Sequence, residues 1–140
     1  MVRIAQAGDA QQLLALNDDF NGKGETTVES IRDSLLHNHQ EVVIVDEEHG
    51  RLTGFVCVQL KRSFCYEVCH AEITEVYVAP DCRKRGIASR MIAFAEKYCS
   101  SCCPLHKFEL LTGEENADAQ SVYLRLGYEK DGEMHLSKRI

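Results

Sequence analysis

Apolar and polar residues follow two different periodicities along the chain, and the changes between them divide it into elements. Apolar residues recur every three to four positions after Asp9 and again after Thr27, which predicts two amphipathic helices, the first reaching about Asn17. Asp and Thr are both good helix N-caps, so Asp9 and Thr27 are the expected starts. Residues 42–60 instead alternate with a period of two on either side of Gly50, a pattern that predicts a β-hairpin.

The second half of the chain alternates between strands and helices. Further strands are expected over 2–7, 71–78 and 107–112, and a last hairpin around Asp131 and Gly132. Helices are expected over 83–99 and over 116–127, the second with Asn116 as its N-cap. The strand–helix–strand unit over 71–112 is a crossover, which places its two strands in parallel, and the remaining pairs are expected to be antiparallel. The sequence therefore predicts one α+β (mixed α/β) domain over residues 1–140, with six to seven strands and about four helices.

Composition fits a single globular domain. Hydrophobic residues make up 44% of the 140 residues and charged residues 27%, as in soluble folded proteins. No apolar run approaches the ~20 residues of a membrane span, and the N-terminus lacks a signal-peptide pattern, so we expect a cytoplasmic protein without a membrane partner. The seven cysteines are then compatible with free thiols. Neither Cys-rich segment has the second C-x-x-C pair of a zinc ribbon, so no metal is expected.

The net charge of −6 is unevenly distributed. Residues 1–50 contain 10 acidic and 3 basic side chains, whereas residues 51–140 contain 12 acidic and 13 basic ones. An acidic surface argues against nucleic acid as the main partner. It suits a cationic small molecule, such as an amine, near the N-terminal half, and the alternative is an acidic surface that only keeps the chain soluble.

The long helix expected in the second half begins with three cations, Arg83, Lys84 and Arg85, although a helix N-terminus already carries a partial positive charge. A bound anion resolves this conflict, because the free N–H groups of a helix N-terminus bind phosphate well. Gly86 has no Cβ and lets a ligand approach the backbone closely, and Ala88 is small as well. The spacing predicts a diphosphate site directly after a strand. The alternative is a solvated basic helix start without a ligand.

Two motifs in the second half resemble the GNAT superfamily of N-acetyltransferases. The segment ITEVYVAPDCRKRGIASRMIAFAEKY resembles the central motif of that family. Its pattern is Gln or Arg, two spacers, Gly, one spacer, and Gly or Ala, which is matched by Arg83, Gly86 and Ala88. The segment NADAQSVYLRLGYEK resembles a second family motif, matched by Asn116, Ala119, Tyr123, Gly127 and Tyr128. The resemblance covers residues 42–133 and implies a twisted mixed sheet whose two parallel strands splay apart at the cofactor site.

The resemblance implies that acetyl-CoA binds as a cosubstrate, without a metal, in the gap between strands 71–78 and 107–112. The diphosphate would lie on backbone N–H groups at the start of the following helix, and the pantetheine arm would pair with the backbone of the first strand. The implied contact residues are Val76, Tyr77, Val78, Arg83, Lys84, Arg85, Gly86, Ile87, Ala88, Ser89, Asn116 and Tyr123.

The resemblance also implies direct attack of a neutral amine on the acetyl carbonyl. Tyr123 is implied as the acid that protonates the leaving thiolate, because a tyrosine has a reference pKa of ~10, although its place on an apolar helical stripe also fits a core residue. The proton acceptor is Glu72, Glu75 or ordered water, with His70 as a further candidate. Glu72 and Glu75 share one face of a strand only if a β-bulge shifts the register.

The acceptor is expected to be a small cationic molecule with a primary amine. The segment GFVCVQLKRSFCYE is similar to aminoglycoside 6'-N-acetyltransferases, and the acidic first half of the chain would attract such polycations, polyamines included. Two alternatives stay open: a protein acceptor, through a lysine or an N-terminal amine, and a non-catalytic domain that senses acyl-CoA. A homodimer through the C-terminal strands is compatible with each of these.

Overall fold

The structure is a computed structural model that describes all 140 residues. Its elements in chain order are β1 (Val2–Ile4), the 3₁₀ turn η1 (Ala7–Asp9), α1 (Ala10–Asn21), α2 (Val28–His37), β2 (Glu41–Glu48), β3 (Arg51–Lys61), β4 (Cys69–Val78), the 3₁₀ turn η2 (Pro80–Cys82), α3 (Ile87–Cys102), β5 (Leu105–Leu110) and α4 (Ala117–Arg125). The α+β class predicted from the sequence is confirmed. None of the helices is long and apolar enough to cross a lipid bilayer.

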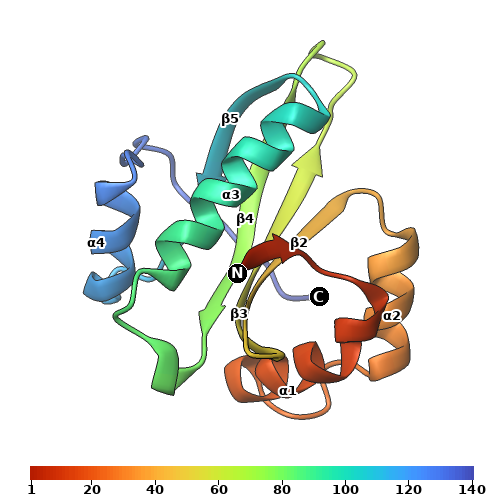
Figure 1. Cartoon of the computed structure of the whole chain (residues 1–140). Coiled ribbons are helices and arrows are strands. Elements are labelled where there is room, and N and C mark those ends of the chain that lie inside the picture. The colour runs from red at the N-terminus through yellow and green to blue at the C-terminus, as the bar shows by residue number, and fades with distance from the viewer.

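The strands form one sheet in the order β1-β2-β3-β4-β5, with helices on both faces (Figure 1). The first four strands pair antiparallel, and β4 pairs with β5 in parallel through the crossover helix α3, as the strand–helix–strand unit predicts. Phe20 of α1 packs against the rings of Phe55 and Tyr77, whereas Met91 of α3 lies against Gly54, the chain neighbour of Phe55. Because consecutive strand residues face opposite sides, α1 and α3 cover opposite faces of the sheet.

The core lies between α3 and the sheet. The apolar residues of α3 recur at helical spacing and are almost fully buried: Ile87, Met91, Ile92, Ala95 and Cys99. Gly54 permits the close approach of this helix, since a Cβ there would lie 2.5 Å from the carbonyl oxygen of Tyr77 and 3.1 Å from Cε of Met91. The first contact, with the backbone of β4, is too short for any Cβ, and the second would require the Met91 side chain to shift, so this position requires glycine.

Local capping signals place two of the helices correctly. Thr27 accepts a hydrogen bond at Oγ1 from the backbone N–H of Ser30 at 3.1 Å, at the start of α2. Asn116 accepts one at Oδ1 from the backbone N–H of Ala119 at 3.2 Å, at the start of α4. Both predicted N-caps are therefore confirmed, because each side chain satisfies an N–H group that has no partner within its helix.

The start and the end of α1 differ from the prediction. Asp9 does not cap α1. Its carboxylate instead accepts hydrogen bonds from the Arg3 guanidinium at 2.8 and 2.9 Å and from the Gln6 N–H at 2.7 Å. An ion pair with a nearby arginine competes successfully with the cap. The helix also continues one turn further than expected, until Gly22, with a φ of 97°, ends it.

The predicted C-terminal hairpin is wrong, and the sheet has five strands instead of six to seven. Residues 129–140 form no strand, although a turn does form there, in which the N–H of Glu133 donates to the Asp131 carboxylate at 3.0 Å. Glu129 and Lys130, which lead into this turn, are both charged, so they offer no alternating apolar face for a strand. The apolar residues after the turn are exposed as a result, Met134 at 82% and Leu136 at 81%.

Candidate active site

A β-bulge interrupts the pairing of β3 with β4. Cys57 lies opposite Glu75, whereas the next residue of β3 lies opposite Ile73, which leaves Thr74 as the extra residue. The extra residue shifts the alternation of side chains, so that Glu72 and Glu75 lie opposite residues of β3 that are two positions apart. Side chains two positions apart share a face, so the bulge places both candidate carboxylates on the same side of the sheet.

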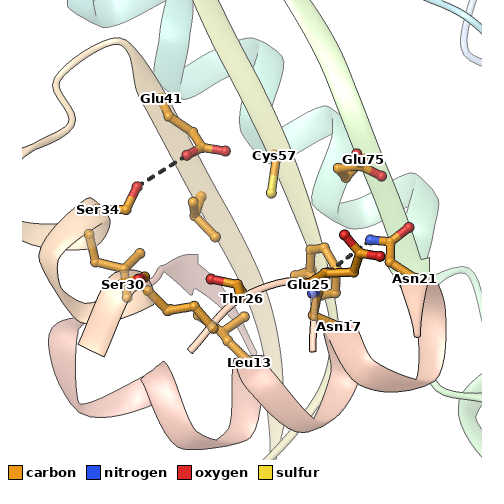
Figure 2. Close-up of a pocket in the computed structure, with 14 residues that line it drawn as sticks. Leu13, Asn17, Asn21, Glu25, Thr26, Ser30, Ser34, Glu41, Cys57 and Glu75 are labelled. Atoms are coloured by element: carbon orange, nitrogen blue, oxygen red, sulfur yellow. Dashed lines mark hydrogen bonds between the residues drawn. The ribbon is translucent and has the colours of Figure 1, made fainter. Parts of the chain in front are cut away.

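Glu75 lines a cavity of about 600 Å³ between the sheet and the first two helices (Figure 2). The cavity wall comes from α1, the loop after it, α2, and the facing side chains of β2, β3 and β4. The polar residues of this wall are Asn17, Asn21, Glu25, Thr26, Ser30, Ser34, Glu41, Cys57 and Glu75. None of the lining side chains is cationic, so the cavity is acidic.

The cavity changes the proton affinity of two groups. Burial raises the pKa of the Glu75 carboxyl above its ordinary value, and the negative charge of Glu41 raises it further. Burial also raises the pKa of the Cys57 thiol well above its ordinary value, and both carboxylates add to this effect. A carboxylate with a raised pKa is a better proton acceptor, whereas a thiol with a raised pKa stays protonated and is a poor nucleophile.

Glu72 has different surroundings, although it faces the same side of the sheet. It forms an ion pair with Lys61 and does not line the cavity. Glu109, opposite Glu72 in β5, lies 3.3 Å from the ring of His70. Glu72 and His70 therefore belong to a charged network near the start of β4. Glu75 is separate from it and has no cationic partner.

The parallel pairing of β4 with β5 ends before β4 does. Its last paired residues are Ile73 and Leu110, whereas β4 continues to Val78. The end of β4, including Val76 and Tyr77, pairs with β3 on one side and has no strand on the other. Because β5 itself ends at Leu110, residues 74–78 of β4 have an unpaired edge on this side.

The N-terminus of α3 presents backbone donors without partners. The N–H groups of Gly86, Ile87, Ala88 and Ser89 donate to no group of the protein, and the first helical bond runs from the N–H of Arg90 to the Gly86 carbonyl at 3.1 Å. Gly86 has a φ of 75°, a left-handed conformation that favours glycine. Four adjacent free N–H groups at the positive end of a 16-residue helix form a site for an anion.

The three cations precede the helix instead of starting it as the sequence predicts, because α3 begins at Ile87, and they have different partners. Arg83 donates from Nε to the Val78 carbonyl at 2.9 Å, which attaches the loop to the end of β4. Arg85 binds both carboxylate oxygens of Glu48 in β2, at 2.8 and 3.0 Å. Lys84 forms no ion pair or hydrogen bond within the protein. Arg85 is thus the one of the three that is neutralised by an ion pair, whereas Lys84 and the Nη groups of Arg83 have no carboxylate partner.

Tyr123 lies half-buried in α4, with its ring centre 6.2 Å from that of Tyr128. Burial raises the pKa of the Tyr123 hydroxyl above its ordinary value. The Tyr128 hydroxyl donates to Glu96 of α3 at 2.7 Å, whereas the Tyr123 hydroxyl has no partner in the protein. The ring of Tyr123 therefore packs as a core residue does, while its hydroxyl stays available as a hydrogen-bond donor, so the two interpretations of this residue are compatible.

Comparison with known proteins agrees with this geometry. The model of the acetyltransferase (GNAT) family matches residues 10–128, which is most of the chain. The chain belongs to the GNAT family of acetyltransferases. This GNAT protein is 27% identical to the uncharacterized N-acetyltransferase YhfO of Bacillus subtilis (strain 168), over 93% of this chain and 90% of the relative. Family and relative together identify the protein as an acetyltransferase enzyme.

Solved structures of acetyltransferases share the fold of this GNAT protein. The aminoglycoside N-acetyltransferase AAC(6')-Iy, in complex with the bisubstrate analogue CoA-S-monomethyl-acetylneamine, has a TM-score of 0.87 at 17% identity, covering 100% of this chain and 97% of that one. The ribosomal-protein-alanine N-acetyltransferase from Brucella melitensis biovar Abortus 2308 has a TM-score of 0.80 at 16% identity and covers 99% of both chains. At these identities the likeness shows the fold alone. One of the two proteins is named for a small-molecule acceptor and the other for a protein acceptor, so the shared fold does not indicate the acceptor of this enzyme.

The sequence did not identify the side of the cavity that the N-terminal half forms. Asn17, Asn21, Glu25 and Glu41 come from a helix, a loop and a strand, and none of them belongs to a motif. The one signal that could have indicated them was the excess of acidic residues in the first fifty positions. That excess predicts that a site in the N-terminal half is negatively charged, but it does not indicate which carboxylates line the same cavity.

Proposed function

We propose that this GNAT enzyme transfers the acetyl group of acetyl-CoA to a primary amine of a small cationic molecule. The observation that supports this most strongly is that one segment of β4, residues 74–78, borders two sites. The side chain of Glu75 lines the acidic cavity, and the edge of the same segment is open toward the gap beside β5. An amine in the cavity and a thioester along the open edge would meet at this segment.

Several features support acetyl-CoA as the acyl donor. The free N–H groups of residues 86–89 suit a diphosphate, and Lys84 is an unpaired cation beside them. The open edge of β4 at Val76 and Val78 offers backbone groups to the amides of the pantetheine arm, in the manner of strand addition. Asn116 caps α4 through its oxygen and keeps its amide nitrogen available for the same arm. The solved AAC(6')-Iy complex holds a CoA-linked analogue, which agrees with this donor.

The proposed reaction is a direct transfer without a covalent enzyme intermediate. The amine nitrogen forms a bond to the acetyl carbon, the carbon–sulfur bond breaks, and CoA leaves as a thiolate. A backbone N–H beside the bulge, near Val76, stabilises the oxyanion that forms on the carbonyl oxygen. Glu75 accepts, directly or through water, the proton that the bound ammonium group loses to become the neutral amine that attacks, and its raised pKa favours this role. Tyr123 donates to the thiolate through its free hydroxyl.

Glu75 is the better candidate for the proton acceptor than Glu72. A proton on Glu72 would weaken its ion pair with Lys61, and that carboxylate lies outside the cavity. His70 is in contact with Glu109 in the same network, so it also lies apart from the bound amine. Glu75 combines a place in the cavity wall with a raised proton affinity, and we assign the acceptor role to it on these grounds.

A thiol-release assay with acetyl-CoA and a panel of amines tests the proposal. The panel contains aminoglycosides, polyamines, amino acids and peptides, and we expect turnover with small polycationic amines. Turnover with peptides alone would favour a protein acceptor. Binding of acetyl-CoA without turnover of any amine would favour a sensor of acyl-CoA. Tyr123→Phe should lower kcat at least about tenfold, and unchanged turnover in this variant would contradict the role of Tyr123 as an acid.

We further propose that two copies of the chain associate through residues 133–140. β5 is the open edge of the sheet, and the exposed side chains of Met134, Leu136 and Ile140 would fall on one side of an extended strand. An open edge and an apolar, strand-like segment favour strand addition between copies. Light scattering tests this proposal. We expect a dimer that becomes a monomer when residues 133–140 are removed, and a full-length chain that stays monomeric at high concentration would contradict it.

A further inference from the structure

The cavity carries more negative charge than the reaction needs. One carboxylate is sufficient to accept a proton, yet Glu25, Glu41 and Glu75 all line the cavity and no cationic side chain does. None of the three forms an ion pair with another part of the protein. Asn21 supplies a further acceptor, because its amide nitrogen donates to Asn17 at 2.8 Å and its oxygen is left free. Such a cavity attracts a ligand with more than one positive charge.

The surroundings of Glu41 point most directly to a bound cation. Glu41 begins β2, and its Oε2 atom accepts long hydrogen bonds from Ser34 Oγ at 3.4 Å and Asn38 Nδ2 at 3.5 Å. Both donors are neutral, and so is the Cys57 thiol that also lies beside this carboxylate, so no cationic group of the protein meets Glu41. Ser34 lies in the last turn of α2 and Asn38 is its C-cap, where the helix dipole is negative. A carboxylate at this end of a helix is unfavourable on its own and becomes favourable when a cation binds beside it.

The sheet register fixes how far apart Glu41 and Glu75 are. Cys57 lies between them on the cavity wall (Figure 2), opposite Glu75 on one side and Val43 on the other, and Glu41 is two residues before Val43. With ~4.8 Å between strands and ~3.3 Å per residue, the α-carbons of Glu41 and Glu75 are roughly 12 Å apart. Both side chains face the cavity, so their carboxylates are taken to keep roughly this separation. With an ammonium nitrogen ~2.8 Å inward from each carboxylate, the two bound nitrogens would be about 6 to 9 Å apart, a distance that four to six carbon atoms span.

We propose that the acceptor is a diamine of this spacing, with its reacting amine at Glu75 and its second ammonium group bound by Glu41. The inference rests on the proposed function, because it assigns a substrate class to the same site. One acetyl group passes from the sulfur of acetyl-CoA to one nitrogen as the carbon–sulfur bond breaks. That nitrogen loses two protons, one through Glu75 to solvent and one to the CoA thiolate, and the products are CoA thiol and a monoacetylated diamine with a single positive charge. Loss of the charge at Glu75 weakens the binding of the product relative to the substrate, which favours its release.

Two substrates that differ only in the second ammonium group show what that group contributes to kcat/KM. 1,5-Diaminopentane and 1-aminopentane have the same chain length and the same reacting amine. We expect the wild-type enzyme to have a kcat/KM at least about tenfold higher for the diamine, since a charge-assisted hydrogen bond is among the strong ones. In Glu41→Gln this preference should fall to about twofold or less, chiefly because KM for the diamine rises. Glu41→Asp keeps the charge and should retain part of the preference.

The control variant is Glu29→Gln, which replaces a glutamate of α2 that does not line the cavity and should keep the wild-type preference. Equal kcat/KM for the two amines in the wild-type enzyme would overturn the inference and leave acetyl transfer intact. An equal loss of kcat for both amines in Glu41→Gln would also overturn it, because Glu41 would then act only through the basicity of Glu75.

Calorimetry gives a readout that does not depend on turnover. In the presence of CoA, 1,5-diaminopentane should bind the wild-type chain at least about tenfold more tightly than it binds Glu41→Gln, with both variants shown to be folded by circular dichroism. Equal binding by the two variants, or no binding by either, would overturn the inference. Selective diamine binding without CoA release in the kinetic assay would leave the diamine site standing and refute the proposed function.

Discussion

The two sites proposed on either side of β4 would recognise their ligands in different ways. The site at the start of α3 uses the backbone, through the free N–H groups of residues 86–89 and the left-handed conformation of Gly86. The cavity uses side chains, with Glu25 from a loop, Glu41 from β2 and Glu75 from β4. A backbone site occupies one short segment and constrains its residue types, whereas a side-chain site assembled from distant elements can change one residue at a time. This division suits a constant acyl donor on one side of β4 and a variable acceptor on the other.

The carboxylate that joins the two sites should show the largest effect on catalysis. Glu75→Gln removes the proton acceptor but keeps the size of the side chain, so kcat should fall by about 10²–10³-fold while KM for acetyl-CoA changes little. The matched variant Glu72→Gln should lower kcat by less than about threefold, because Glu72 is paired with Lys61 outside the cavity. Steady-state thiol release measures both, and equal losses in the two variants would contradict the assignment.

The backbone site should be sensitive to a Cβ at Gly86. Gly86 and Gly50 have similar left-handed backbones, with φ of 75° and 79°, so Gly86→Ala and Gly50→Ala should each cost about 1 kcal/mol of unfolding free energy. Only Gly86→Ala should also raise KM for acetyl-CoA, by about five- to tenfold, because Gly50 lies in the β2–β3 turn away from the helix start. Denaturant titration and initial rates separate the two effects. A similar rise of KM in both variants would mean that residues 86–89 do not hold the diphosphate.

The pH dependence should link the cavity to the reaction. Because burial and the charge of Glu41 raise the pKa of Glu75, activity should begin to fall, on acidification, at a higher pH than an unperturbed glutamate would give. Glu41→Gln removes the negative neighbour and should move this acidic limb of the kcat profile to lower pH. A limb that stays in place, or moves to higher pH, would show that Glu75 is not the group that titrates.

The same raised pKa has a consequence for folding. The native state binds a proton at Glu75 more tightly than the unfolded chain does, so this group favours folding at low pH and loses that contribution as pH rises through its native pKa. Glu75→Gln should therefore raise Tm relative to the wild type at neutral pH and have less effect near pH 4. A Tm difference that is larger in acid than at neutral pH would contradict the sign of this linkage.

The smallest effect is expected from the exposed cations of the backbone site. Lys84→Ala should raise KM for acetyl-CoA by about two- to threefold and weaken its dependence on salt, since an exposed charge is screened by solvent. Arg85→Ala should change KM less, because Arg85 is already neutralised by Glu48. A larger rise of KM in Arg85→Ala than in Lys84→Ala would show that Arg85 leaves Glu48 to bind the ligand.

Local signals were sufficient to predict most of the fold. Thr27 and Asn116 cap their helices as the sequence indicates. Each of these features depends on residues within one turn of the chain. A prediction from local sequence therefore has all the information it needs in these cases.

Features that depend on distant contacts could not be predicted in the same way. The bulge at Thr74 shifts the register by one residue and depends on how β3 and β4 pair. From the sequence we could say only that a bulge in this strand would bring Glu72 and Glu75 onto one face. The position of Glu41 beside the end of α2 depends on how the first helices lie on the sheet. Around Asp131 a local signal predicted too much. The turn residues are present, but the residues on either side do not form the strands of a hairpin.

A crystal structure with CoA and 1,5-diaminopentane bound would test the central claim most directly, namely that β4 joins an anion site to an acidic amine cavity. The account predicts that diphosphate oxygens accept hydrogen bonds from the N–H groups of residues 86–89, with one diamine nitrogen beside Glu75 and the other beside Glu41. A diphosphate bound away from residues 86–89, or a diamine bound outside the cavity, would contradict it.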